Sequence, residues 1–134
     1  MTFFSAVIEG NPVPQGSFRH VGNGRIITAN PKLNDWRHTI ATQIAQQTHH
    51  RLIEAPVTVQ LLFTLERPKS VSRERRERPT VKPDLDKLIR ATLDAISLER
   101  YCQILKDDSI VTDIRAAKRY ADNLAPGVWI QITW

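Results

Sequence analysis

Apolar and polar residues alternate most regularly in the segment VTVQLLFTL, residues 57–65. An extended chain turns every second side chain to the same side, so this alternation predicts a strand with one buried face. Two further segments alternate in the same way, at residues 110–121 and 128–134. Two shorter apolar segments, at residues 2–10 and 24–30, are consistent with brief strands.

Two other segments repeat their apolar residues every three or four positions, which is the period of a helix. The first segment begins at Pro31 and extends to about residue 51, with Leu33, Trp36, Ile40 and Ile44 on one face. The second follows Pro83, and its apolar stripe consists of Leu85, Leu88, Ile89, Thr92 and Ile96. Both segments are therefore predicted to be helices that bury one side.

In chain order these elements read β-α-β-α-β-β. That order predicts an α+β fold in which the helices pack on a mixed sheet. The chain contains no internal repeat and no linker-like segment, so we expect a single domain over residues 1–134. The last two strands are close enough in sequence to form an antiparallel hairpin.

The composition is ordinary for a globular chain, with 134 residues, 41% hydrophobic and 25% charged. Cys102 is the single cysteine, so an intramolecular disulfide is impossible and a cysteine-based zinc site is not expected. The N-terminal residues lack the pattern of a signal peptide, and no apolar run approaches the length of a membrane span. We therefore expect a cytoplasmic protein that does not enter a membrane.

The formal net charge of the chain is +5, and one short segment accounts for it. Residues 67–82, RPKSVSRERRERPTVK, contain seven basic and two acidic residues, so this segment alone carries a charge of +5. A basic run can be a solvated loop and nothing more. It can also neutralise the phosphates of a polyanion such as a nucleic acid.

Two acidic pairs follow the basic segment. Asp84 and Asp86 lie in KPDLDKL, where the second predicted helix begins. Asp84 stands where an N-cap residue is expected, and Asp86 can pair with Arg90 one turn later. Taken separately, each of these two aspartates has a purely structural explanation.

The second acidic pair, Asp107 and Asp108 in KDDS, has no such explanation, because adjacent like charges in a loop repel each other. If the strand that follows pairs beside the start of the helix, Asp108 approaches Asp84 and Asp86. Three carboxylates at close range need a cation, and Mg²⁺ prefers such oxygen ligands. The combination predicts a magnesium site next to a basic segment.

The segment KPDLDKLIRATLDAI, followed after a short gap by KDDSIV, resembles the signature of the RusA family of Holliday junction resolvases. The resemblance is strong over residues 79–111, and GNPVPQGSFRH near the N-terminus is similar to the opening strand and loop of that family. The resemblance implies a small, magnesium-dependent, homodimeric endonuclease of bacterial or prophage origin. Its expected partner is branched DNA, in particular a four-way junction.

The resemblance also assigns roles to individual residues. Asp84, Asp86 and Asp108 match the catalytic, metal-binding aspartates of the family, and Asp107 matches an acidic neighbour. Arg90 stands where the family often has an essential lysine, and Lys87 stands where an asparagine is common. Arginine keeps the positive charge but does not take over a lysine's proton transfer. The residues expected to contact DNA are Arg19, Arg73, Arg75, Arg76, Arg78, Lys82 and Lys87.

The reaction implied is hydrolysis of a phosphodiester, with paired symmetric nicks across a junction in DNA recombination and repair. A nucleic-acid-binding module that has the basic segment but no cleavage activity is the alternative. A phosphohydrolase of small molecules is a third interpretation. The basic segment disfavours it, because a nucleotide needs fewer positive groups than a duplex.

Overall fold

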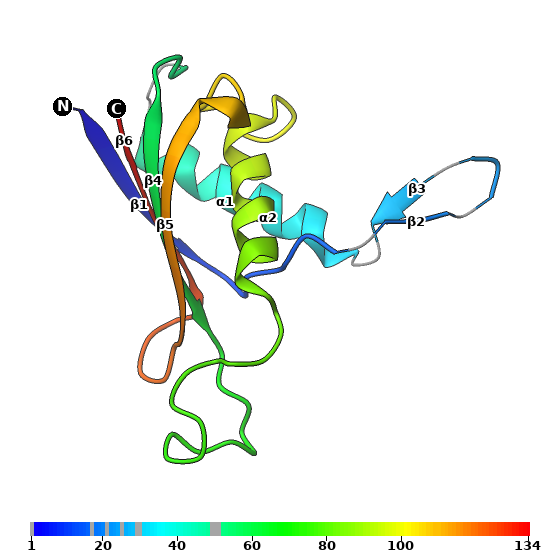
Figure 1. The fold of residues 1–134 in the computed structure, drawn as a ribbon, viewed down its shortest axis with the longest axis vertical. Helices are drawn as coiled ribbons and strands as arrows, with labels where there is room; N and C mark the ends of the chain where they lie inside the picture. The colour runs from blue at the N-terminus through cyan, green and yellow to red at the C-terminus, as the bar shows by residue number, and fades with distance from the viewer. Residues whose placement is uncertain (1, 17, 21, 25, 29–30, 49–51) are drawn as a thin grey trace.

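The computed structural model describes residues 2–16, 18–20, 22–24, 26–28, 31–48 and 52–134. Their central element is a sheet of four strands in the order β1-β6-β4-β5 (Figure 1). The bounds of these strands are Phe3–Glu9 for β1, Val57–Leu65 for β4, Val111–Tyr120 for β5 and Gly127–Thr133 for β6. The predicted alternation in β4 is confirmed, because every second residue from Val57 to Leu65 is buried.

The sheet is mixed, as predicted. Strand β4 pairs with β5 in parallel and with β6 antiparallel, and β6 also pairs antiparallel with β1. The expected hairpin between the last two strands is wrong, because β4 lies between β5 and β6. The six residues 121–126 carry the chain past the end of β4, so a short connection in sequence does not make these strands neighbours.

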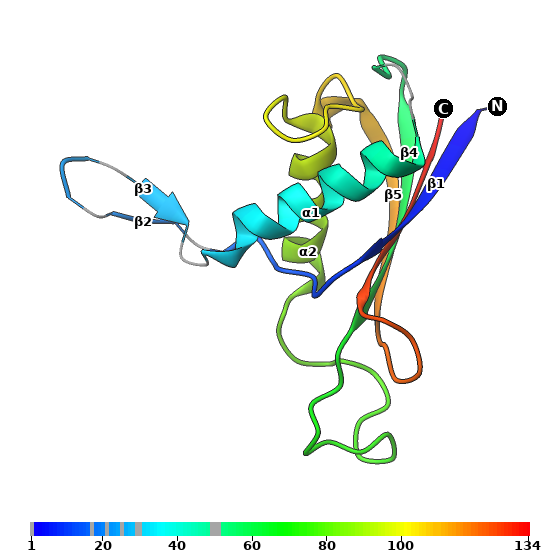
Figure 2. The same cartoon turned by 180° about the vertical axis from the view of Figure 1, so that it is seen from behind.

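Both predicted helices are present, as α1 (Lys32–Gln47) and α2 (Leu85–Ser97). They pack on the same face of the sheet (Figure 2). The predicted core residues of α1 are buried, and in α2 the buried side includes Leu88, Thr92 and Ile96. The apolar sides of both helices and of the sheet meet in one hydrophobic core. None of the helices in the described part of the chain is long and apolar enough to cross a membrane.

A small separate sheet projects from the body of the molecule near the N-terminal end of α1 (Figure 1). It consists of the antiparallel strands β2 (Phe18–His20) and β3 (Ile26–Thr28). The sequence indicated only the second of these strands. The predicted helix end at residues 49–51 lies outside the described residues.

Helix α2 and strand β5 lie side by side and run in opposite directions. The last residue of α2, Ser97, contacts Asp108 just before β5 begins. Near the other end of β5, Lys118 contacts Pro83 just before α2 begins. This arrangement decides how far apart the two acidic pairs lie.

Candidate metal and nucleic-acid site

Asp84 occupies the N-cap position of α2, as predicted, but its carboxylate does not cap the helix. Its side chain accepts no hydrogen bond from the first turn, and Oδ2 lies 3.4 Å from Lys87 Nζ instead. The side chain of Asp84 is 48% exposed. A carboxylate that is not bound to the helix N–H groups keeps its oxygens available for a cation.

Asp86 lies in the first turn of the same helix and is exposed. The predicted ion pair between Asp86 and Arg90 is not among the interactions of the described residues. Arg90 is exposed on α2, and its charge partly opposes the rise that burial causes in the pKa of Asp94, one turn further on. Asp84 and Asp86 thus form an open acidic pair with basic side chains on either side.

Asp84 also lines a hollow of about 420 Å³ between the start of α2 and the N-terminal loop. Two cationic side chains, from Lys82 and Lys87, line the same hollow, together with Pro12, Pro14, Gln15, Gly16 and Pro83. Gln15 N donates a hydrogen bond of 2.9 Å to Lys87 O, which ties the loop to the helix. The hollow therefore combines a metal-type ligand with two groups that can neutralise phosphate.

Lys118 supports this end of α2 from strand β5. Its Nζ donates hydrogen bonds of 2.8 Å to the carbonyl oxygens of both Val81 and Pro83. These carbonyls lie on the two sides of Lys82 and directly precede Asp84. Sequence analysis did not single out Lys118, because nothing in its local pattern indicates a contact with a segment 35 residues away.

The second acidic pair lies at the other end of α2. Asp108 Oδ1 accepts a hydrogen bond from the buried Ser97 hydroxyl. Asp107 caps a short 3₁₀ helix, η1 (Asp108–Ile110), by accepting a bond of 3.0 Å from Ser109 N. The hydrogen bonds from Ser109 lower the pKa of Asp107. Asp107 therefore has a local structural role, which sequence analysis did not find.

Asp94 lies close to Asp108 on the last turns of α2 and is half-buried. Burial raises its pKa, the ion pair with Arg37 opposes this rise, and the charge of Asp108 adds to it. Arg37 Nη2 lies 2.6 Å from Asp94 Oδ2 and also donates to the Gln15 side chain. Arg37 is itself buried, so α1, α2 and the N-terminal loop share one polar network.

The structure does not bring Asp108 to Asp84 and Asp86 within one chain. The two acidic pairs lie at opposite ends of α2, whose 13 residues correspond to about 20 Å. Residues 98–107 fold back onto the last turn of α2, where Ile104 N and Leu105 N both donate to Ile96 O. Asp108 is consequently held at that end. Among the described residues, no group of three histidine, cysteine, aspartate or glutamate side chains is placed to hold a metal ion.

The predicted DNA-binding residues of the basic segment lie in a long loop between β4 and α2 (Figure 1). Arg73, Arg75, Arg78 and Lys82 are exposed, and none of their charged groups has a hydrogen bond or ion pair among the described contacts. Arg76 differs, because its Nε donates a bond of 2.8 Å to Tyr120 Oη and its side chain is half-buried. Arg19 lies in β2, away from this loop.

Comparison with known proteins identifies similar sequences. A family model described as "Endodeoxyribonuclease RusA" matches residues 9–133. "Uncharacterized protein YqaN" of Bacillus subtilis (strain 168) is 30% identical over 126 residues, covering 86% of each chain. The family match includes both acidic pairs, the basic segment and the N-terminal loop. The chain therefore belongs to the RusA family of endodeoxyribonucleases.

Proposed function

We propose that this protein is a magnesium-dependent endodeoxyribonuclease that resolves Holliday junctions by paired symmetric nicks. The observation that carries the proposal is the hollow in which the uncapped carboxylate of Asp84 lies beside Lys82 and Lys87. The adjoining basic loop supports DNA as the substrate, because the exposed charged groups of Arg73, Arg75 and Arg78 have no hydrogen bond or ion pair among the described residues. Family membership supports the reaction class.

The carboxylates of Asp84, Asp86 and Asp108 fit Mg²⁺ in kind, because they are hard oxygen ligands. Their positions within one chain do not fit a common metal ion, because the length of α2, about 20 Å, separates Asp108 from Asp84 and Asp86. A homodimer whose two-fold axis passes near the middle of α2 removes this difficulty. It reverses the direction of α2 in the second copy, so that Asp108 of that copy approaches Asp84 and Asp86, and two equal sites form.

Asp84 and Asp86 of one copy and Asp108 of the other would hold the magnesium ion, which would supply an activated water and neutralise charge on the phosphate. The residues of the chain itself hold the DNA for that step. Lys82 and Lys87 bind the phosphate from the hollow, and Arg90 stabilises the negative charge that develops on it. Arg90 stays protonated throughout, so it contributes charge and hydrogen bonds but no proton transfer.

Cleavage of a synthetic four-way junction and of a linear duplex, with and without Mg²⁺, tests the proposal. We expect nicks in the junction only with the metal, and loss of nicking in Asp84→Asn, Asp86→Asn and Asp108→Asn with junction binding retained. Asp113→Asn, an exposed aspartate of β5, is the matched control and should cleave normally. Binding without nicking by the wild-type protein would favour the non-catalytic binding module instead.

A mixture of two inactive variants tests the shared site. If each site uses Asp84 of one copy and Asp108 of the other, mixed dimers of Asp84→Asn and Asp108→Asn retain one intact site. We expect the mixture to regain single-strand nicking that neither variant shows alone. If each chain holds a complete site of its own, every site in the mixed dimer is damaged and no activity returns.

A further inference from the structure

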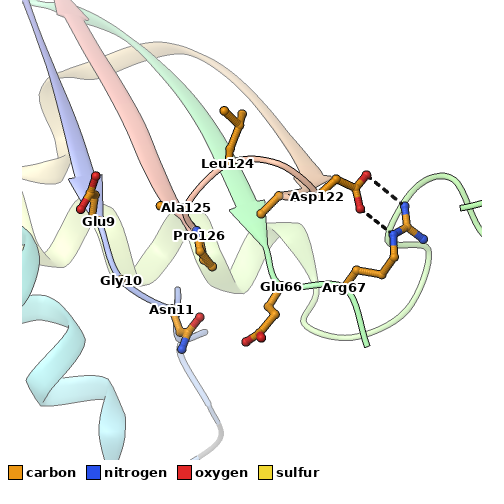
Figure 3. A pocket seen from close by; sticks show the side chains of 10 residues that line it. Glu9, Gly10, Asn11, Glu66, Arg67, Asp122, Leu124, Ala125 and Pro126 are labelled. Carbon is orange, nitrogen blue, oxygen red and sulfur yellow. Dashed lines mark hydrogen bonds and ion pairs between the residues drawn. The ribbon is translucent and has the colours of Figure 1, made fainter. Parts of the chain in front are cut away.

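Arg67 is the first residue of the basic segment, yet its side chain is bonded to other residues of the protein and is 13% exposed. Its Nε donates a bond of 2.7 Å to Asp122 Oδ1, an ion pair that Figure 3 shows at the rim of a hollow. Its two terminal nitrogens donate to three backbone carbonyls, those of Ser72, Arg76 and Glu77. Arg67 is therefore occupied by the protein and is not available to DNA.

Tyr120, at the end of β5, contacts both Arg67 and Arg76. The guanidinium of Arg67 lies 4.1 Å from the centre of the Tyr120 ring, at the distance of a cation–π contact. The Tyr120 hydroxyl accepts a bond of 2.8 Å from Arg76 Nε. Arg67 and Tyr120 together thus bind residues at both ends of the loop.

The loop between these contacts, residues 68–78, is further closed by its own turn. Ser72 accepts at its hydroxyl from Arg75 N at 3.2 Å and at its carbonyl from Arg76 N at 3.0 Å. Three of the loop's carbonyls point toward Arg67, while the side chains of Arg73, Arg75 and Arg78 are exposed. The hydrogen bonds to Arg67 thus direct the carbonyls of the loop inward and leave its arginine side chains facing solvent.

A preformed loop has a specific effect on DNA binding. A loop that must order itself on the DNA loses conformational entropy at that moment, and this loss weakens the complex. A loop that Arg67 already holds closed loses less conformational entropy when it binds DNA. The charge of the loop alone therefore does not determine its affinity.

We propose that Arg67, Tyr120 and Asp122 form a clamp that positions the basic loop for the DNA backbone. The proposal rests on the proposed function, since it takes DNA phosphates to be the ligand of the loop. The three are positioning residues, because none of them contacts the DNA. They act by holding Arg73, Arg75 and Arg78 in the arrangement that meets the phosphates.

A charge-conserving pair of variants tests the clamp. Arg67→Lys keeps the charge but cannot donate at once to Asp122 and to three carbonyls, whereas Arg115→Lys makes the same exchange at an exposed arginine of β5 outside the loop. Without added metal, we expect Arg67→Lys to raise the Kd for a four-way junction about 5- to 10-fold and Arg115→Lys to leave it unchanged. At saturating DNA, nicking by Arg67→Lys should proceed at the wild-type rate.

Asp122→Asn is a second clamp variant on the surface, and it should weaken binding in the same direction. Trypsin should cut the loop of both clamp variants faster than that of the wild type, at unchanged thermal stability of the core.

Arg73→Gln/Arg75→Gln/Arg78→Gln separates the two proposals, because it removes the charges and keeps the clamp. If this triple variant binds poorly while Arg67→Lys and Asp122→Asn bind normally, the clamp is wrong and the proposed function stands. If the triple variant binds normally, the loop is not the DNA-binding surface and both claims about it fail.

Discussion

At the residue scale, the aspartates that could bind a metal could be identified from the sequence, whereas the side chains that support them could not. Asp84 was predictable, because a proline followed by an aspartate before an apolar stripe is typical of a helix start. Lys118 was not, because its two carbonyl acceptors come from another part of the chain. Support of this kind depends on tertiary contacts and has no local pattern.

Lys118→Met tests whether this support matters for the reaction. The substitution keeps a long unbranched side chain and removes the ammonium group that donates to the carbonyls of Val81 and Pro83 and so fixes the segment before Asp84. We expect junction cleavage at saturating DNA to slow about tenfold, since a small displacement of a catalytic group is enough for such a loss. Binding should change less than twofold. Lys106→Met, in an exposed lysine paired loosely with Glu54 at 3.6 Å, is the control and should cleave normally.

Cys102 gives a second prediction at this scale. Burial raises the pKa of its thiol to about 11, and the thiol lies 3.3 Å from Ala95 O. At pH 8 the folded protein should react with iodoacetamide about 100-fold more slowly than the urea-unfolded chain, because the thiolate is the reactive form. Raising the pH should speed the reaction of the folded protein up to about pH 11. Equal rates in the folded and unfolded states would contradict the burial of this side chain.

At the scale of elements, periodicity predicted both helices and strands β4 and β6, because each buries one continuous face. Strand β5 is also present, but none of its residues is buried. Periodicity did not predict which strands are neighbours in the sheet. Strands β5 and β6 are consecutive in sequence, yet β4 lies between them. The parallel pairing of β5 with β4 also places Asp108 beside Ser97, at the end of α2 opposite to Asp84. Sequence analysis identified the aspartates but could not place them relative to one another, because strand order is not encoded in any local pattern.

The contact between α2 and η1 leads to a prediction for Ser97→Ala. The hydroxyl of Ser97 holds Asp108 Oδ1, so its removal leaves the Asp108 carboxylate free to turn. We expect the Mg²⁺ concentration for half-maximal cleavage to rise about 10-fold, as is typical when a hydrogen bond that orients a metal ligand is lost. Junction binding without metal should not change. Ser5→Ala, in an exposed serine of β1, is the control, and an equal shift in that variant would point to a general effect on the fold.

At the scale of the whole molecule, the charge is distributed so that the basic loop and the first acidic pair occupy the same end. The segment 67–82 carries the entire formal excess of +5 and leads directly into Asp84. Lys82 and Lys87 continue the cationic surface into the hollow. The segment that attracts DNA and the residues of the candidate site are therefore adjacent in the chain, and this arrangement could be predicted from the sequence.

This distribution predicts how junction binding depends on salt. Each phosphate neutralised by a lysine or arginine contributes about −0.9 to the slope of log K against log salt concentration. The side chains of Arg73, Arg75, Arg78, Lys82 and Lys87 are exposed. Five contacts from these residues give an expected slope of about −4.5 per chain. Replacing the three loop arginines by glutamine should bring the slope to about −2, whereas Arg115→Gln, in an exposed arginine of β5, should leave it unchanged. A slope that is the same in the wild type and in the triple variant would mean that the basic loop attracts no DNA. The positive charge of the chain would then serve only to keep the loop in solvent.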